Sequence, residues 1–174
     1  PPAPGGAPRE VWSYPLVQHV MSSPVIHEGL VFIADTGRRL HCLDAATGRE
    51  IWSFETKDAV DAAPAVGGGR VYLSSNDGKL YALAADTGAV VWTLATDEKI
   101  SSGATLVRNP GGPGEWVLVN GYDGTTRALD AADGRVARPT RAPGFFSMPT
   151  QTPTLSSRPL PLAFRPGRWV GPAR

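Results

Sequence analysis

The chain has 174 residues, of which 41% are hydrophobic and 19% are charged, and its formal net charge at pH 7 is +1. A chain of this length can build one domain with a buried core, and no apolar run comes near the roughly 18 residues that a membrane-spanning helix needs, which excludes a membrane span. The single cysteine, Cys42, excludes an internal disulfide bond, so cysteine usage leaves the compartment open.

Residues 1–8 are rich in proline and glycine and begin without methionine. They show none of the features of a secretory signal peptide. We expect a disordered N-terminal segment here, in a chain that either has lost a leader or is a fragment of a longer protein.

From residue 9 onward the sequence repeats at a fixed offset. Matching residues lie forty positions apart, as in the pairs Pro24 and Pro64, Leu40 and Leu80, Leu43 and Leu83, Gly48 and Gly88, and Trp52 and Trp92. One step back from Trp52 lies Trp12, in a similar segment. The step from the second unit to the third is forty-six residues, because the loop at 108–115 adds six. The chain therefore contains units at about 22–60, 62–100 and 102–136.

Each unit is a series of short apolar runs between turn residues. The first unit predicts strands at 23–26, 30–34, 40–44 and 50–54, and the second at 63–66, 71–74, 80–84 and 90–94. Four short antiparallel strands in about forty residues are typical of a β-propeller blade. The sequence thus predicts an all-β fold, a partial β-propeller over 9–136. We expect about three four-stranded antiparallel blades, preceded by one strand of an earlier blade at Arg9–Trp12.

The last segment, 137–174, has a different composition. It contains eight prolines and six arginines and no Asp or Glu. A basic tail of this kind could contact nucleic acid or an anionic surface, but arginines scattered among prolines favour an irregular, unstructured tail. We expect no nucleic-acid partner.

Two glycine-containing patterns resemble ligand loops. The run Gly67–Arg70 resembles a phosphate-binding loop but lacks the Gly-Lys-Ser/Thr ending and a following helix. Asp77-Gly78 and Asp123-Gly124 resemble the start of a calcium loop, but the later acidic ligands are missing. Since all three fall between predicted strands, we interpret them as hairpin turns.

The remaining reactive side chains also favour structural roles. No spacing among His19, His27 and His41 brings two histidines onto one face with a carboxylate, which argues against a zinc site or a triad. Ser101-Ser102 takes the place of Ser22-Ser23 in the first unit, and Cys42 matches Ala82 and Ala128 as a buried filler. Arg38-Arg39 is interpreted as a solvated turn. We predict no catalytic, cofactor-binding or metal-binding residue.

The segment from Leu43 to Trp52 reads Leu-Asp-Ala-Ala-Thr-Gly-Arg-Glu-Ile-Trp. It resembles the tryptophan-docking repeat of pyrroloquinoline-quinone-type propellers. The resemblance covers 9–136 and implies that each Trp packs across a blade interface. Two departures stand out: Ala84 replaces the motif's Asp, and Arg138 replaces its Trp.

Such repeats occur in quinoprotein dehydrogenases and in the non-enzymatic propeller that assists outer-membrane protein assembly. The resemblance therefore implies a protein-binding scaffold in the periplasm or cell envelope, with an unidentified protein partner and no cofactor of its own. A fragment of a quinone-dependent dehydrogenase is the alternative, although one cysteine cannot form the vicinal disulfide typical of those enzymes. A sensor domain is a third possibility. Three blades cannot close a ring, so we expect the remaining blades elsewhere.

Overall fold

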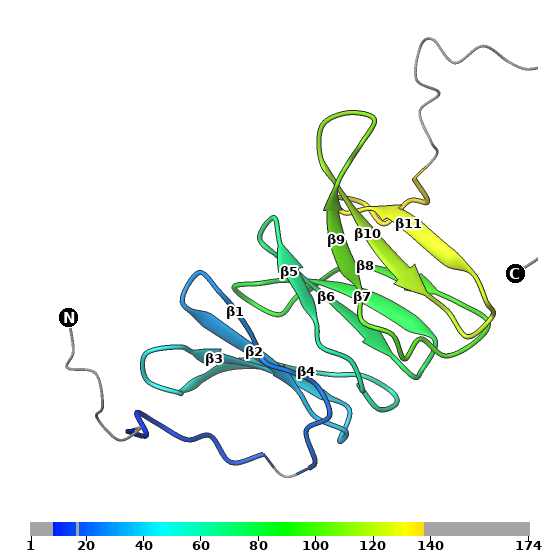
Figure 1. The fold of residues 1–174 in the computed structure, drawn as a ribbon. Helices are drawn as coiled ribbons and strands as arrows, with labels where there is room; N and C mark the ends of the chain where they lie inside the picture. Colours follow the sequence, from blue (N-terminus) through cyan, green and yellow to red (C-terminus); the bar gives the residue numbers. More distant parts are fainter. Residues whose placement is uncertain (1–8, 17, 138–174) are drawn as a thin grey trace, which may run out of the picture. The chain divides into compact units, whose positions relative to one another are not determined.

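A computed structural model describes residues 9–16 and 18–137 of the chain. This part of the chain forms eleven β-strands in three antiparallel sheets that follow one another along the sequence (Figure 1). It contains no helix. The all-β prediction is confirmed. The segments predicted to be disordered, 1–8, and irregular, 137–174, lie outside the described residues, apart from Ala137.

The first sheet contains four strands in sequential order. They are β1 (Val25–His27), β2 (Leu30–Ala34), β3 (Arg39–Asp44) and β4 (Glu50–Glu55). All neighbouring pairs are antiparallel. The sequence placed each strand correctly, with the start of β1 two residues too early.

The second sheet repeats the first. Its strands are β5 (Ala65–Gly67), β6 (Arg70–Ser75), β7 (Lys79–Ala84) and β8 (Val90–Ala95), again in sequential order. Even the irregularity recurs: the register between the third and fourth strands shifts at Cys42/Leu43 in the first sheet and at Ala82/Leu83 in the second. Such a bulge increases the local twist of the outer strand.

The third sheet contains β9 (Thr105–Arg108), β10 (Glu115–Asn120) and β11 (Thr126–Asp130). Only the start of a fourth strand is present, as a single antiparallel bridge between Leu129 and Val136. The Ala137 amide N–H continues this pairing by donating to the Ala128 carbonyl at 2.7 Å. The structure thus shows three strands of the third predicted blade and the first pairing of a fourth strand, and residues after Ala137 lie outside the described part of the chain.

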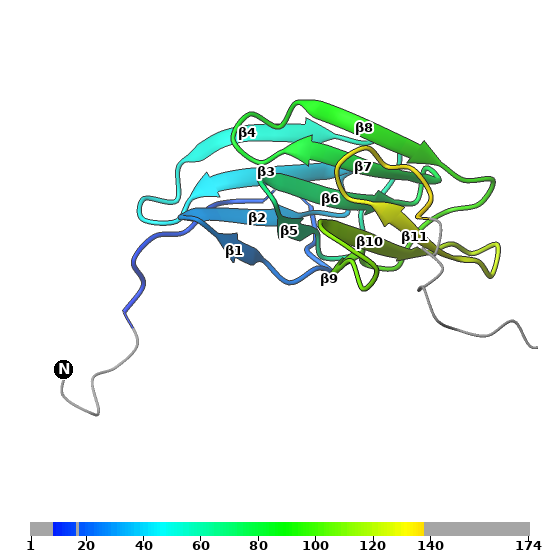
Figure 2. The ribbon, with the colours of Figure 1, turned by 90° about the horizontal axis from the view of Figure 1, so that it is seen from above.

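The sheets pack face to face through two apolar clusters. One cluster joins the first sheet to the second and includes Phe32, Leu40, Cys42, Leu73 and Leu83. The other joins the second to the third and includes Tyr72, Leu80, Val117, Val119 and Leu129. The first strands β1, β5 and β9 contact one another in succession, while β4 and β8 lie at the opposite edge of their sheets (Figure 2). This is the blade arrangement of a propeller.

Each repeat tryptophan docks onto the turn between the third and fourth strands of the next sheet. The indole N–H of Trp12 donates to the Ala45 carbonyl at 2.9 Å, that of Trp52 to Ala85 at 3.0 Å, and that of Trp92 to Ala131 at 3.2 Å. The side chains are partly buried. The tryptophan-docking role inferred from the repeat is therefore present at three equivalent places.

Glycine is required beneath each indole. Gly48, Gly88 and Gly134 have φ values of 72°, 71° and 73°, in the left-handed region that favours glycine. An added Cβ at these positions would lie 2.6 to 2.7 Å from ring atoms of the docked tryptophan. Both the turn and the close approach therefore depend on the missing side chain.

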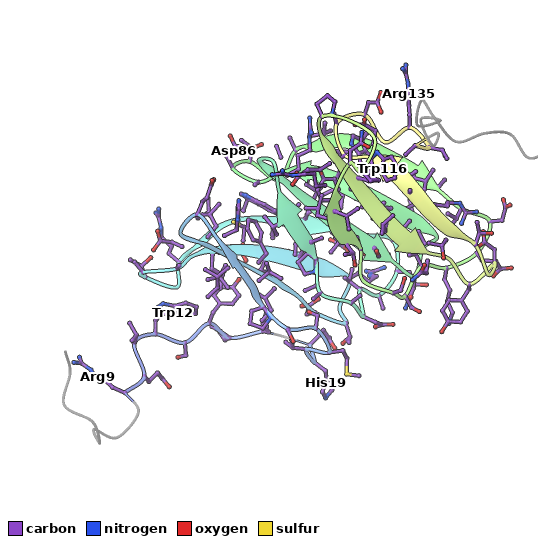
Figure 3. The ribbon with its side chains drawn as sticks, turned by 45° about the horizontal axis from the view of Figure 1, so that its top comes forward. Arg9, Trp12, His19, Asp86, Trp116 and Arg135 are labelled. Atoms are coloured by element: carbon purple, nitrogen blue, oxygen red, sulfur yellow. The ribbon has the colours of Figure 1, made fainter. Side chains whose placement is uncertain are left out.

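The segment 9–16 carries the docked Trp12 but is not part of a sheet (Figure 3). Within the part of the chain that the structure describes, it has no strand partner. Its side chains nevertheless take the places of β4 side chains, since the Tyr14 ring packs on His41 as the Phe54 ring packs on Tyr81. It thus corresponds to the predicted outer strand of a preceding blade.

Replacing Trp52 with alanine should lower the free energy of unfolding by about 3 kcal/mol, because a large buried aromatic surface and a hydrogen bond are lost. Trp92→Ala should have a similar effect at the next interface. Chemical denaturation of the full chain would measure both changes. Val91→Ala is the matched control and should change stability little, because Val91 adjoins Trp92 but is 46% exposed. Equal stability of Trp52→Ala and the wild type would contradict the docking role.

Candidate functional site

An open cleft of about 820 Å³ lies beside the first sheet. It is bounded by the β2–β3 hairpin, by the segment that precedes β1, and by residues that follow β4. Its lining is mostly polar and charged and includes Tyr14, Asp35, Arg38, His41, Glu50 and Glu55. Small-ligand pockets are mostly apolar and enclosed, so this open polar cleft is better suited to a polar group presented by a larger molecule.

The floor of the cleft is a histidine held between two carboxylates. His41 Nδ1 lies 2.7 Å from Glu50 Oε2, and His41 Nε2 lies 3.5 Å from Asp35 Oδ2. The side chains of His41 and Asp35 are only 9% and 6% exposed. Asp35 also accepts a hydrogen bond from the Arg39 backbone N–H at 3.0 Å. Each buried polar group therefore has a partner.

Tyr14 closes this cluster from the N-terminal segment. Its hydroxyl group donates to Glu50 and lies 3.4 Å from His41 Nδ1. Burial and the hydrogen bond to Glu50 raise the pKa of Tyr14 to about 12. The hydrogen bonds from Tyr14 and then His41 lower the pKa of Glu50. The cluster therefore favours an ionised Glu50 and a neutral Tyr14.

The mouth of the cleft carries two arginines that share one carboxylate. Arg38 and Arg39 lie 3.3 Å and 3.0 Å from the two Glu55 oxygens. All three side chains are about half exposed, at 52%, 46% and 49%. Exposed pairs of this kind contribute only about 0.2–1 kcal/mol each to stability. One positive charge of this trio remains uncompensated.

Arg38 has an unusual backbone conformation. Its φ value is 72°, in the left-handed region, whereas the equivalent residues of the second and third sheets are Gly78 and Gly124, with φ values of 79° and 73°. An L-residue with a Cβ atom costs roughly 1–2 kcal/mol in this region. The exposed pairing with Glu55, at about 0.2–1 kcal/mol, is smaller than that cost.

The equivalent hairpins of the other two sheets are stabilised by different side-chain contacts. In the second sheet the Tyr81 hydroxyl group donates to Asp77 at 2.6 Å, and in the third Arg127 pairs with Asp123, which lowers the pKa of Asp123 to about 2. The first sheet has Gly37 in place of this aspartate. A Cβ there would lie 2.5 Å from Gln18 Cγ, so Gln18 occupies the position of the missing side chain.

Two of the patterns that resemble ligand loops lie in ordinary turns. Gly68 and Gly69, with φ values of 58° and 69°, form the β5–β6 turn. Asp77 accepts hydrogen bonds from the Lys57 and Lys79 backbone N–H groups as well as from Tyr81. These groups are therefore occupied by contacts within the protein.

The other candidate residues lie apart from the cleft floor. His27 is 3.8 Å from Glu28 at an exposed turn. Ser102 Oγ donates to the Asn120 carbonyl at 2.8 Å, as Ser22 Oγ donates to that of Ala34 at 3.0 Å. Cys42 is buried between the first and second sheets, and burial raises the pKa of its thiol to about 11.

The described ranges, 9–16 and 18–137, lack two further kinds of feature. No group of three or more His, Cys, Asp or Glu side chains there is arranged to hold a metal ion. No helix among these residues has the length and apolar character needed to cross a membrane.

The sequence did not reveal this cluster. It predicted no site at His41, because it considered only pairs of histidines on one face with a carboxylate. The structure instead joins His41 to Tyr14 and Glu50, which lie 27 and 9 residues away in the sequence. One signal was present: the hairpin reads Thr-Gly-Arg where the second unit reads Asn-Asp-Gly, so its glycine is displaced by one position.

Comparison with known proteins identifies the relatives of this fold. The sequence matches the family described as "Outer membrane protein assembly factor BamB" over residues 7–153. The structure is similar to BamB from Moraxella catarrhalis, with a TM-score of 0.63 and 25% identity over 74% of this chain. It is also similar to the quinohemoprotein alcohol dehydrogenases of Comamonas testosteroni and Pseudomonas putida HK5. Their TM-scores are 0.57 and 0.59 at 26% identity, over 68% and 71% of this chain.

The chain spans only part of these proteins. It covers 38% of the length of the M. catarrhalis BamB and 20% and 21% of the two dehydrogenases. A search of the curated proteins found no match.

Replacing Tyr14 with phenylalanine should lower the melting temperature at pH 7, because Glu50 loses its principal hydrogen-bond donor. The folded-state pKa of Glu50 is lowered, so its stabilising contribution is complete above the ordinary Glu pKa of about 4.3 and is lost as the pH falls through the folded value. The difference from the wild type should therefore shrink between about pH 5 and pH 3. Thermal melts across this range would test it, with Tyr122→Phe, 63% exposed, as the control. A difference that stays constant with pH would contradict the role of Glu50.

Proposed function

The chain belongs to the family of outer membrane protein assembly factor BamB, and from this premise we propose that it is a non-enzymatic propeller segment that binds other proteins through its loops. Its role in this proposal is that of a scaffold in cell-envelope or outer-membrane protein assembly. The partner is a protein, and the compartment is the periplasm.

The observation that carries the proposal is the loop at 109–114. The corresponding turns of the first two sheets contain two residues each, between His27 and Leu30 and between Gly67 and Arg70. The third sheet has six residues between the paired Arg108 and Glu115, so the loop accounts for four of the six residues that the sequence assigned to it. All six are exposed except the first, Asn109, which is intermediate. This loop adds protein surface without adding a strand.

The loop is held in a defined shape by its own hydrogen bonds. The Asn109 side chain accepts from the Gly111 backbone N–H at 2.8 Å and donates to the Pro113 carbonyl at 3.1 Å. The Asn109 backbone N–H donates to the Gly114 carbonyl at 3.0 Å. Two prolines restrict the backbone further. A loop ordered before binding loses little conformational entropy when it contacts a partner, which favours protein recognition.

Replacing residues 109–114 with Asn-Gly should abolish binding to the outer-membrane assembly proteins of the same cells while leaving the fold intact. Arg108 and Glu115 already form the last pair of the hairpin, and Asn-Gly suits a two-residue turn between such strands. Binding of the purified full-length proteins would be measured by interferometry, and folding by the melting temperature.

The matched control replaces Gly68-Gly69, the short turn of the second sheet, with the same Asn-Gly pair. This variant should bind like the wild type. Unchanged binding after removal of the 109–114 loop would show that the loop is not the contact surface.

The second candidate is a fragment of a quinone-dependent dehydrogenase, which the likeness to the two quinohemoprotein enzymes supports. In that enzyme class the quinone lies in a central channel walled by a complete ring of blades. Three blades wall less than half of a ring of seven or eight, so under this alternative as well the cofactor site requires additional blades.

We predict that the purified chain, mixed with pyrroloquinoline quinone and calcium, will retain no quinone after desalting and will not oxidise alcohols or sugars. Retention would be measured by absorbance, and turnover by a dye-linked assay against a protein-free control. Stoichiometric retention, or turnover above the control, would overturn the scaffold proposal for this chain.

A further inference from the structure

From the strained Arg38 and the hydrogen-bonded floor of the cleft at Asp35, His41 and Glu50, we infer that the cleft beside the first sheet is a second protein-binding site. We propose that it takes an extended segment in which an acidic side chain and a basic side chain lie two residues apart. The inference rests on the proposed function in one respect, that the ligand is a protein segment. The two surfaces are separate, because the 109–114 loop lies at the other end of the strands.

The first argument is the position of Arg38. The equivalent hairpin residues of the other sheets are glycines with the same backbone conformation. Arginine at this position is strained, and its guanidinium group is half exposed at the mouth of the cleft. A strained residue whose side chain reaches a cleft points to function there, because folding alone favours glycine.

The second argument is the floor. Asp35 and His41 are more than nine-tenths buried and still line the cleft. Their geometry is fixed by Arg39, Glu50 and Tyr14 through hydrogen bonds. Glu50, 34% exposed, is the part of this floor that a ligand can reach. The site is thus held in position before any ligand arrives.

The charges of the cleft indicate the chemistry of the ligand. At the mouth, two guanidinium groups share one carboxylate, so donors remain for a second carboxylate. The floor and wall add the carboxylates of Asp35, Glu50 and Asp58. A purely acidic ligand would be repelled by these groups, and a purely basic ligand would be repelled by the arginines. A ligand with both charges satisfies the two regions together.

The spacing of the two charges follows from the shape of an extended chain. Alternate side chains of an extended segment point to the same side. An acidic residue and a basic residue two positions apart can therefore both face the cleft, while the residue between them faces solvent.

The test is a binding titration of the full chain with a synthetic twelve-residue peptide that repeats Ser-Glu-Ser-Lys. Control peptides repeat Ser-Glu-Ser-Glu and Ser-Lys-Ser-Lys. The mixed peptide should bind, and the controls should bind at least about tenfold more weakly. The charge assignment would be overturned if either control peptide, the acidic or the basic one, bound as tightly as the mixed peptide.

Two variants separate binding from folding. Arg38→Gly should raise the melting temperature, since the strain is removed, and should weaken binding of the mixed peptide about tenfold. Arg38→Ala should weaken binding equally but keep the strain. Arg135→Ala is the charge-matched control, because the Arg135 side chain is 87% exposed and does not line this cleft. This variant should bind the mixed peptide normally.

Unchanged peptide binding by both Arg38 variants would overturn the inference. The Asn-Gly replacement of residues 109–114, tested with the same peptide, keeps this inference distinct from the proposed function. That variant should bind the mixed peptide normally, and loss of peptide binding in it would show that the peptide does not occupy the cleft.

Discussion

The structure depends on one contact, the docking of an indole onto the turn of the next sheet. A β-sheet with two apolar faces is unstable alone, and each sheet here buries its faces only against its neighbours. Burial of apolar surface has no direction, so it does not fix how two sheets are rotated against each other. The indole hydrogen bond fixes this rotation, because it joins one side-chain nitrogen to one carbonyl oxygen across each interface.

The turn that receives the indole tolerates much variation in its side chains. In the first sheet, the Asp44 carboxylate accepts from the Ala46 and Thr47 backbone N–H groups. The second sheet has Ala84 at this position and no such acceptor, yet its Gly88 N–H donates to the Ala84 carbonyl at 2.8 Å, the same distance as between Gly48 and Asp44. The backbone hydrogen bond and the left-handed glycine are therefore sufficient to form the turn, and the aspartate reinforces it.

The repeat made most of the fold predictable. Recurrence of whole residue sets showed where strands and turns lie, and the recurrence of Gly48 as Gly88 marked the same turn in two units. The cleft was harder to foresee, because its residues come from separate elements and none matches its equivalent in another unit. His41 corresponds to Tyr81 and Arg127, and Glu50 to Val90. An alignment of repeats presents such positions as freely variable, although Tyr14, His41 and Glu50 join into one hydrogen-bonded cluster beside the first sheet.

The two proposed binding regions lie at opposite ends of the strands, and this separation follows from the blade. At one end of the strands, hydrogen bonds join the turn between the first two strands to the turn between the last two, as the Ala45 N–H donates to the Gly29 carbonyl at 2.9 Å. The hairpin end is tied to the preceding linker, as Thr36 N–H donates to the His19 carbonyl at 2.9 Å. Because the strands between them are rigidly paired, either end can change its sequence without disturbing the other. A strained arginine at one end and a long loop at the other are therefore compatible with one unchanged core.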